Sequence, residues 1–436
     1  MNLKEKITAS FTAPENQGEI AKNALFGEKK LAAFNSFKQQ DFPTTKNEDW
    51  KYTNLKPLLK NNFELFPNKT HTLQEKDIKK YLLIEESSIN LVFVNGFFDS
   101  NLSTNLQEIS EINTLSSIAA KEKSQAEFKQ LFETTESIDN CFVNLNNAFL
   151  SDGVFINIPK GKAYEPVIQI LYLTHGDAEA SMFQAKNLVF VGENSQVKII
   201  ESHYNLSENK SLTNSFTEIY AGKSALVAYH KIQNDQVNAS LIDHTYVHQK
   251  SKSEVSLFTL SLGGDLTRNN LVFNHQGEHI NSNLYGVSIL NKSQHVDNNT
   301  LINHQQPNCE SNECYKGIYA ENSTGVFNGK VYVHREAQKT NAYQQNDNIL
   351  LDNTATINAK PQLEIFADDV KCSHGCTMGE LDNDALFYLK TRGIPENDAK
   401  KLLLYAFANE AVENIKIPSL KKSIAHLIDE KLDTLS

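Results

Sequence analysis

Residues 187–232 read NLVFVGENSQVKIIESHYNLSENKSLTNSFTEIYAGKSALVAYHKI, and they carry the strongest signal of the fold class. Short runs rich in β-branched and aromatic residues follow one another, separated by Gly, Asn, Ser and Lys. Such runs are typical of β-strands, and no helical pattern of about 10–15 residues lies between them. A parallel sheet built from βαβ units is therefore not expected.

The same pattern extends on both sides of this stretch. No proline occurs from residue 167 to residue 306, and β-rich runs fill the interval at close spacing. This spacing suits a sandwich, a barrel or a β-solenoid. We favour the solenoid, because stacked turns accommodate many strands without a thicker core. Asparagine is frequent from residue 269 to 358, and stacked turns can bond asparagine amides in ladders.

Composition limits the classes of protein that this chain can belong to. It has 436 residues, 40% of them hydrophobic, and a net charge of −11, so we expect a globular protein with two or three structural regions. No basic surplus exists to neutralise phosphates, and no run of 18 apolar residues occurs, so neither nucleic-acid nor membrane binding is expected. Five cysteines and a start without a signal sequence indicate reduced thiols in the cytoplasm.

Helical patterns flank the β-rich part of the chain. The sequence predicts a mainly helical region over residues 1–138, a β-helix core over 139–376, and a helical region over 377–436. In the last region Asp382 suits the start of a helix, Gly393 suits the position after its end, and Pro395 can open the next helix. These helices either pack on the core or present a face to a partner, and their pattern leaves both possibilities open.

The segment KPQLEIFADDVKCSHG, residues 360–375, leads into a row of soft ligands. Cys372, His374 and Cys376 alternate, so on a strand they share one face. Neighbours on that face lie roughly 6.6 Å apart, whereas zinc–ligand bonds are about 2.0–2.3 Å long. Either Gly375 breaks the strand, or the row is part of a site that another surface completes. An ordinary core role for the cysteines is the alternative reading.

Common catalytic motifs do not occur in this sequence. There is no GxxxxGK[ST] loop, no GxSxG turn and no HExxH helix. Cys309 and Cys314 lack a matching second pair, so a zinc module is not expected. Two alternatives to a scaffold function stay open: a β-helix enzyme acting on carbohydrates, and a structural metal-binding solenoid.

Six ordered motifs carry a family resemblance. These are NEDWKYT (47–53), FVNLNNAFLSDGVFINIPKG (142–161), GGDLTRNNL (263–271), QHVDNNTLINH (294–304), the segment 313–351, and KPQLEIFADDVKCSHG. In this order they resemble the SufB/SufD family of iron–sulfur cluster assembly proteins, and its SufD branch more than its SufB branch. The resemblance implies a mainly β protein with a right-handed parallel β-helix between helical regions.

The resemblance also implies the partners and the cargo. It implies a non-catalytic scaffold that pairs with SufB through the β-helices and with the ATPase SufC, which hydrolyses ATP, through the C-terminal helices. A homodimer is implied for the isolated chain. A transient iron or iron–sulfur cluster is implied at the subunit interface, and a reduced flavin on the complex, with neither bound tightly by this chain alone.

Particular residues follow from matching the family pattern. Cys372 and His374 fall on the Cys-Ser-His of the family and are implied at the cluster-assembly interface, as metal ligands shared with the partner. Cys376 stands where relatives commonly have alanine, so no role is assigned to it. The implied docking surface for the ATPase comprises Leu381, Leu386, Phe387, Leu389, Arg392, Leu402, Leu403 and Phe407.

Overall fold

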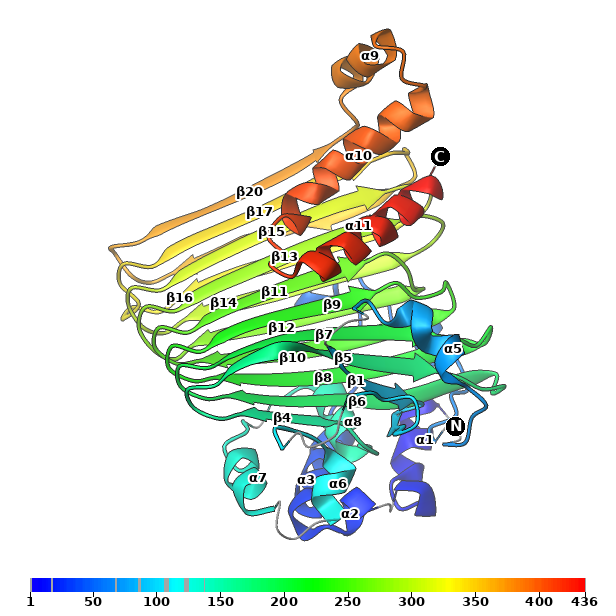
Figure 1. Cartoon of the computed structure of the whole chain (residues 1–436), viewed down its shortest axis with the longest axis vertical. Helices are drawn as coiled ribbons and strands as arrows, with labels where there is room; N and C mark the ends of the chain where they lie inside the picture. The colour runs from blue at the N-terminus through cyan, green and yellow to red at the C-terminus, as the bar shows by residue number, and fades with distance from the viewer. Residues whose placement is uncertain are drawn as a thin grey trace.

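The computed structural model describes residues 2–16, 19–66, 69–84, 88–105, 110–120, 125–136 and 138–435 (Figure 1). Strands of the long middle part wind back and forth between two sheets, and helices lie at both ends of the winding (Figure 1). The predicted mainly β fold, a β-solenoid between helical regions, is confirmed. None of the helices in the described ranges is long and apolar enough to cross a membrane.

Two sheets form the walls of the solenoid. The first sheet contains, in hydrogen-bonded order, β2 (Phe97–Phe98), β1 (Ser88–Val94), β5 (Ala163–Thr174), β7 (Gln196–Asn205), β9 (Leu226–Gln233), β11 (Glu254–Ser261), β13 (Asn281–Leu290), β15 (Glu310–Tyr319), β17 (Asn341–Leu350) and β20 (Lys371–Gly379). The second contains β3 (Ile112–Thr114), β4 (Val154–Ile158), β6 (Ala180–Val191), β8 (Lys210–Ala221), β10 (Ala239–Gln249), β12 (Leu266–His275), β14 (His295–His304) and β16 (Thr324–Val333), which pairs with both β18 (Thr356–Ala359) and β19 (Gln362–Ile365).

The register shows how the turns stack. Leu266 on β12 pairs with His295 on β14, which pairs with Thr324 on β16, in parallel and without a bulge. From β4 to β18 successive strands alternate between the two sheets. Each turn of the chain therefore adds one strand to each wall, which is why the described strands contain no helical crossover of the βαβ kind.

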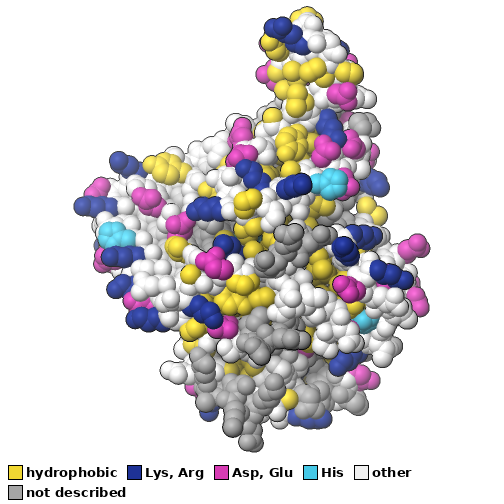
Figure 2. Space-filling model, viewed as in Figure 1, with side chains coloured by type: hydrophobic (Ala, Val, Ile, Leu, Met, Phe, Trp, Pro, Cys, Tyr) yellow, Lys and Arg dark blue, Asp and Glu magenta, His cyan; other side chains and the backbone are white. Residues whose placement is uncertain are grey.

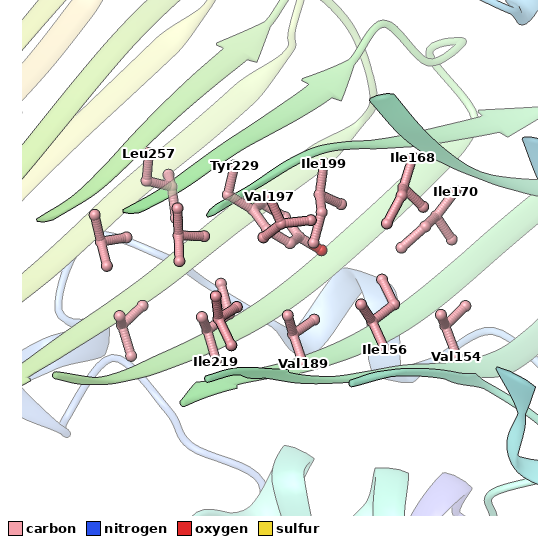
Figure 3. Close-up of a cluster of buried hydrophobic side chains, with 14 of the residues drawn as sticks. Val154, Ile156, Ile168, Ile170, Val189, Val197, Ile199, Ile219, Tyr229 and Leu257 are labelled. Carbon is pink, nitrogen blue, oxygen red and sulfur yellow. The ribbon is translucent and has the colours of Figure 1, made fainter. Parts of the chain in front are cut away.

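Inward-facing side chains of both walls meet in an apolar core in the first half of the solenoid. Figure 3 shows Ile168 and Ile199 of the first sheet facing Ile156 and Val189 of the second, and all four are fully buried. Burying one such side chain contributes about 1.5–3 kcal/mol. The alternation of β-branched residues in the sequence thus fixes which face of each strand points inward.

In the later turns the interior becomes polar, and amides stack from turn to turn. The Gln233 Nε2 donates to Asn269 Oδ1 at 2.7 Å, and Asn269 Nδ2 donates to Asn298 Oδ1 at 2.9 Å. These bonds join β9, β12 and β14, and the three side chains are buried. The predicted asparagine ladders are confirmed, because a buried amide needs such partners.

One corner of the solenoid repeats an unusual backbone conformation. Asn194, Ser224, Lys252, Asn308 and Lys339 all have φ between 55° and 64°, in the left-handed region. Their backbone N–H groups donate to a carbonyl of the next turn, as in Asn194 to Lys223 at 2.9 Å and Ser224 to Ser251 at 3.0 Å. The stacked bonds hold a conformation that non-glycine residues adopt at an energetic cost.

Most of the N-terminal helices cover the outer face of the second sheet, whereas the short helix at residues 75–78 packs on the first sheet through Ile78. They are α1 (Leu3–Ser10), α2 (Glu19–Lys22), α3 (Ala24–Gln39), α4 (Lys56–Leu59), α5 (Glu75–Ile78), α6 (Leu115–Ala120), α7 (Gln125–Phe132) and α8 (Cys141–Ala148), with short 3-10 turns at Pro14–Asn16, Glu48–Trp50 and Lys79–Tyr81. Phe37 and Phe142 pack there with Met182 and Ile242 of the sheet. Trp50 anchors this layer, with its ring 3.8 Å from the guanidinium of the buried Arg268.

Three helices follow the last strand. They are α9 (Asn383–Thr391), α10 (Glu396–Val412) and α11 (Pro418–Asp433), and α10 and α11 pack on the outer face of the first sheet. As predicted, the Asp382 side chain caps α9 by accepting from two backbone N–H groups at 2.9 and 3.1 Å, and Gly393 follows its end with φ +86°. Helix α9 projects beyond the last strand (Figure 1).

Candidate functional site

Strand β20 carries the predicted row of soft ligands at the open end of the solenoid. Cys372, His374 and Cys376 pair in register with Ala342, Gln344 and Asn346 of β17, whose side chains are buried inside the solenoid. The row therefore continues the inward-facing columns of the first sheet. Among the described strands β20 has one hydrogen-bonded neighbour, β17, so the row lies on an unpaired edge where His374 is exposed.

The strand runs straight through Gly375, so the side chains of the row stay spread along one face of β20. The β20 register with β17 is unbroken from Lys371 to Gly379. In the part of the chain that the structure describes, no group of three His, Cys, Asp or Glu residues could hold a metal ion. The structure thus excludes a break at Gly375, while a site completed by another surface and an ordinary packing role for the cysteines both stay predictions.

The two thiols of the row are protonated in the isolated chain. Burial raises the pKa of the Cys372 thiol above its usual range. Burial and the nearby Asp347 carboxylate raise the pKa of the Cys376 thiol. A thiol must lose its proton to bind metal, so an added cation is needed to ionise these groups.

The predicted docking residues divide into two groups. Phe387, Arg392 and Leu402 are exposed, whereas the other five are half-buried. Leu381 and Phe407 pack against the apolar cluster that α10 and α11 form with the first sheet. Tyr388, next to Phe387, is also exposed. The sequence prediction did not include Tyr388, although it belongs to the same amphipathic run. Figure 2 shows hydrophobic side chains on the projecting part of the molecule, where Figure 1 places α9.

Comparison with known protein families identifies the family of this chain. The family model described as "SUF system FeS cluster assembly, SufBD core domain" matches residues 172–407, and "SufBD protein N-terminal region" matches residues 1–170. The chain belongs to the SufBD family. It is accordingly a component of the SUF system for iron–sulfur cluster assembly, and this membership replaces the carbohydrate-enzyme and structural-solenoid alternatives.

Individual SufBD relatives match along most of their length. An iron–sulfur cluster assembly SufBD family protein of Synechocystis is 33% identical over 96% of this chain and 92% of its own. The iron–sulfur cluster assembly protein SufD of Escherichia coli is 27% identical over 89% of both chains. The SufD protein of Bacillus subtilis is 25% identical over 89% of both.

Below the row, the interior of this SufBD protein holds a buried acid. His374 pairs with Gln344, and Gln344 pairs with Glu313 on β15. The Thr300 hydroxyl donates to Glu313 Oε2 at 2.7 Å, and both Thr300 and the neighbouring Gln344 side chain partly offset the effect of burial on the pKa of this carboxyl. Burial raises the pKa of Glu313 to about 7, so this carboxyl is partly protonated near neutral pH.

Replacing Glu313 with glutamine is expected to flatten the pH dependence of stability. The folded pKa of about 7 exceeds the ordinary value of 4.5, so the folded chain holds the proton more tightly than the unfolded chain does. Protonated Glu313 therefore stabilises the folded chain by a free energy on the order of 3 kcal/mol. This stabilisation is fully present below pH 4.5 and is lost as the pH rises to about 7. Calorimetry should show a smaller loss of unfolding free energy between pH 5 and pH 8 for E313Q than for wild type. The exposed neighbour Glu310→Gln is the control, and equal slopes in all three proteins would contradict the assignment.

Another ionic cluster lies deeper in the solenoid. Lys231 on β9 is 3.0 Å from Glu201 on β7 and 2.9 Å from Asp243 on β10, so it joins the two walls. Burial opposes its charge, but the two carboxylates outweigh burial and raise the pKa of Lys231. His203 Nε2 and the Tyr229 hydroxyl also bond Glu201, at 2.7 and 2.5 Å. Sequence reasoning missed this cluster, since its members are separate residues in ordinary strand runs.

Proposed function

We propose that this chain is the SufD-type subunit of a SUF scaffold, and that its last turn supplies half of an iron–sulfur assembly site. The observation that carries the proposal is the incomplete ligand row of Cys372 and His374 on the unpaired edge strand β20. The similarity to two proteins named SufD supports the SufD part of this proposal. In this reading the chain is a non-catalytic scaffold, and ATP hydrolysis belongs to a SufC-type partner.

Iron and sulfide are the cargo of this site. A neutral imidazole suits iron, and so does a thiolate. Cys372 and His374 lie at alternate positions of one straight strand, so each can provide one ligand to an ion held between this edge and a second surface. Binding a cation there would lower the pKa of the Cys372 thiol and release its proton. A reduced flavin, which the resemblance implies, would act on the complex, and no residue of this chain is assigned to it.

A second β-helix subunit of the SufB type is the proposed partner at this end. An exposed edge strand offers unpaired backbone groups and favours pairing with another strand. Large apolar side chains are also exposed on β20 and the segments beside it, namely Tyr343, Phe366 and Met378. The same features would allow two copies of this chain to pair when it is isolated. The five free cysteines suit a reducing compartment such as the cytoplasm.

The projecting helix α9 is the proposed attachment point for a SufC-type ATPase. Phe387 is 69% exposed and Tyr388 55% exposed, on a helix none of whose residues is buried. An aromatic pair exposed in this way is typical of an interface anchor. The docking residues proposed are those of the sequence reading, together with Tyr388.

Changing Phe387 to serine is expected to abolish capture of the ATPase and leave the fold intact. Losing a central aromatic anchor typically costs an interface 2 kcal/mol or more, which is about thirtyfold in affinity. The measurement is co-purification of a tagged chain with the SufC-type subunit. Tyr52→Ser, at an exposed tyrosine in the N-terminal region, is the matched control. Undiminished capture by F387S would contradict the docking assignment.

A further inference from the structure

Helix α10 and strand β20 are joined by a continuous line of charged and hydroxyl side chains. The Glu410 carboxylate on α10 is 2.5 Å from Lys316 Nζ on β15. The same Nζ is 2.9 Å from Asp347 on β17. The Thr377 hydroxyl on β20 then donates to Asp347 at 2.6 Å. One helix and the last three strands of the first sheet are thus linked through side chains on the outer face.

Neighbouring groups along this line stabilise each other's ionised forms. Burial disfavours the charge of Lys316, but Glu410 and Asp347 outweigh burial and raise its pKa. Burial also disfavours the charge of Asp347, while Thr377 and Lys316 outweigh it and lower the pKa of that carboxyl. The Lys316 and Asp347 side chains are only 7% and 13% exposed, so salt screens their attraction weakly. Lys316 and Asp347 are therefore both charged near neutral pH.

We propose that Lys316 is a positioning residue that couples helix α10 to the terminal strand β20. Moving α10 would withdraw Glu410 from Lys316 and loosen the hold of Asp347 on Thr377. Strand β20 has β17 as its one described hydrogen-bonded neighbour, so it responds most to a change there. A role of this coupling in cluster assembly rests on the proposed function, in which an ATPase acts on the C-terminal helices and the ligand row lies on β20.

The apolar contacts of α10 separate this coupling from simple attachment of the helix. Leu404, Ala408 and Ala411 are buried against the first sheet and hold α10 in place without any charged residue. Glu410 is 64% exposed. Replacing it with glutamine therefore breaks the line at its helix end and leaves the helix packed. A change on β20 in that variant would have to pass through Lys316.

Hydrogen exchange of the backbone amides of residues 371–379, measured on the isolated full-length chain, tests the coupling. We expect exchange to quicken about two- to fivefold in Glu410→Gln and about tenfold in Lys316→Met, because each removes an ionic restraint on the edge strand. The double variant should match Lys316→Met alone, since Glu410 has lost its partner there. Lys316→Arg should restore the wild-type rate. Glu413→Gln, which breaks the exposed pair of Glu413 with Lys421, is the matched control and should change nothing on β20.

Two results would overturn the proposal. One is unchanged exchange of residues 371–379 in Glu410→Gln. The other is a double variant in which the two effects add. The experiment needs no ATPase or second subunit, so it can fail while the proposed assembly function stands, and it can succeed if that function is wrong.

Discussion

Replacing Lys231 with methionine is expected to destabilise the solenoid by about 3–5 kcal/mol, because it leaves two buried carboxylates without a counter-charge. Glu201 and Asp243 are buried on opposite walls, and both bond Lys231. Burial opposes the ionisation of Glu201, but Lys231 and His203 outweigh it and hold the pKa of Glu201 below its usual range. Without Lys231 the folded chain must protonate these acids or open the interior to water.

Native-state hydrogen exchange over β7 to β10 measures the stability that K231M is expected to lose. A variant that also carries Glu201→Gln and Asp243→Asn should recover most of the stability, because no isolated charge is left. Lys198→Met is the control, since Lys198 lies on the neighbouring strand and forms only an exposed pair at 3.9 Å. If K231M were no less stable than the triple variant, the charge of Lys231 would not be what joins the walls.

Replacing His374 with alanine is expected to lower cluster production in cells by at least about tenfold without unfolding the chain. The loss of one ligand should cost at least as much metal affinity as the loss of a residue that merely orients a ligand. His374 is exposed and its strand remains paired with β17, so the substitution creates no cavity in the core. The measurement is the activity of an iron–sulfur enzyme in cells that depend on this chain.

The control for this prediction is His426→Ala. His426 is exposed on α11, where it pairs with Glu430 of the same helix, far from the ligand row in the sequence. Both variants should still co-purify with the other subunits. Normal cluster production by an assembled H374A complex would contradict the role of His374.

The course of the solenoid could be predicted because its strands carry their own signals. Runs such as QVKI at 196–199 alternate in burial as a strand requires, and no helical pattern separates them. The asparagines could be placed in ladders because a buried amide has few other ways to find partners. The start and end of α9 followed from Asp382 and Gly393, which act through local geometry. The boundaries at residues 138 and 376 stay predictions.

Features that depend on contacts between distant residues could not be predicted. Ser224 and Lys252 carry no local sign of a left-handed backbone, because bonds to the next turn impose it. The line from Glu410 to Thr377 joins four elements, and its middle members look like surface residues in the sequence. For the ligand row, the sequence predicted a shared strand face, but only the stacking of turns shows that it lies at the open end of the solenoid.

Site-specific crosslinking can show which subunit lies against β20 in the assembled complex. The chain, with a photo-crosslinking amino acid in place of the exposed Ser373 on β20, would be expressed with SufB-type and SufC-type subunits. Lys160, exposed at the turn between β4 and β5 near the first turns, is the control position. We expect a crosslink from position 373 to the SufB-type subunit and none to that subunit from position 160. A crosslink to that subunit from position 160 alone would contradict a shared site at the last turn.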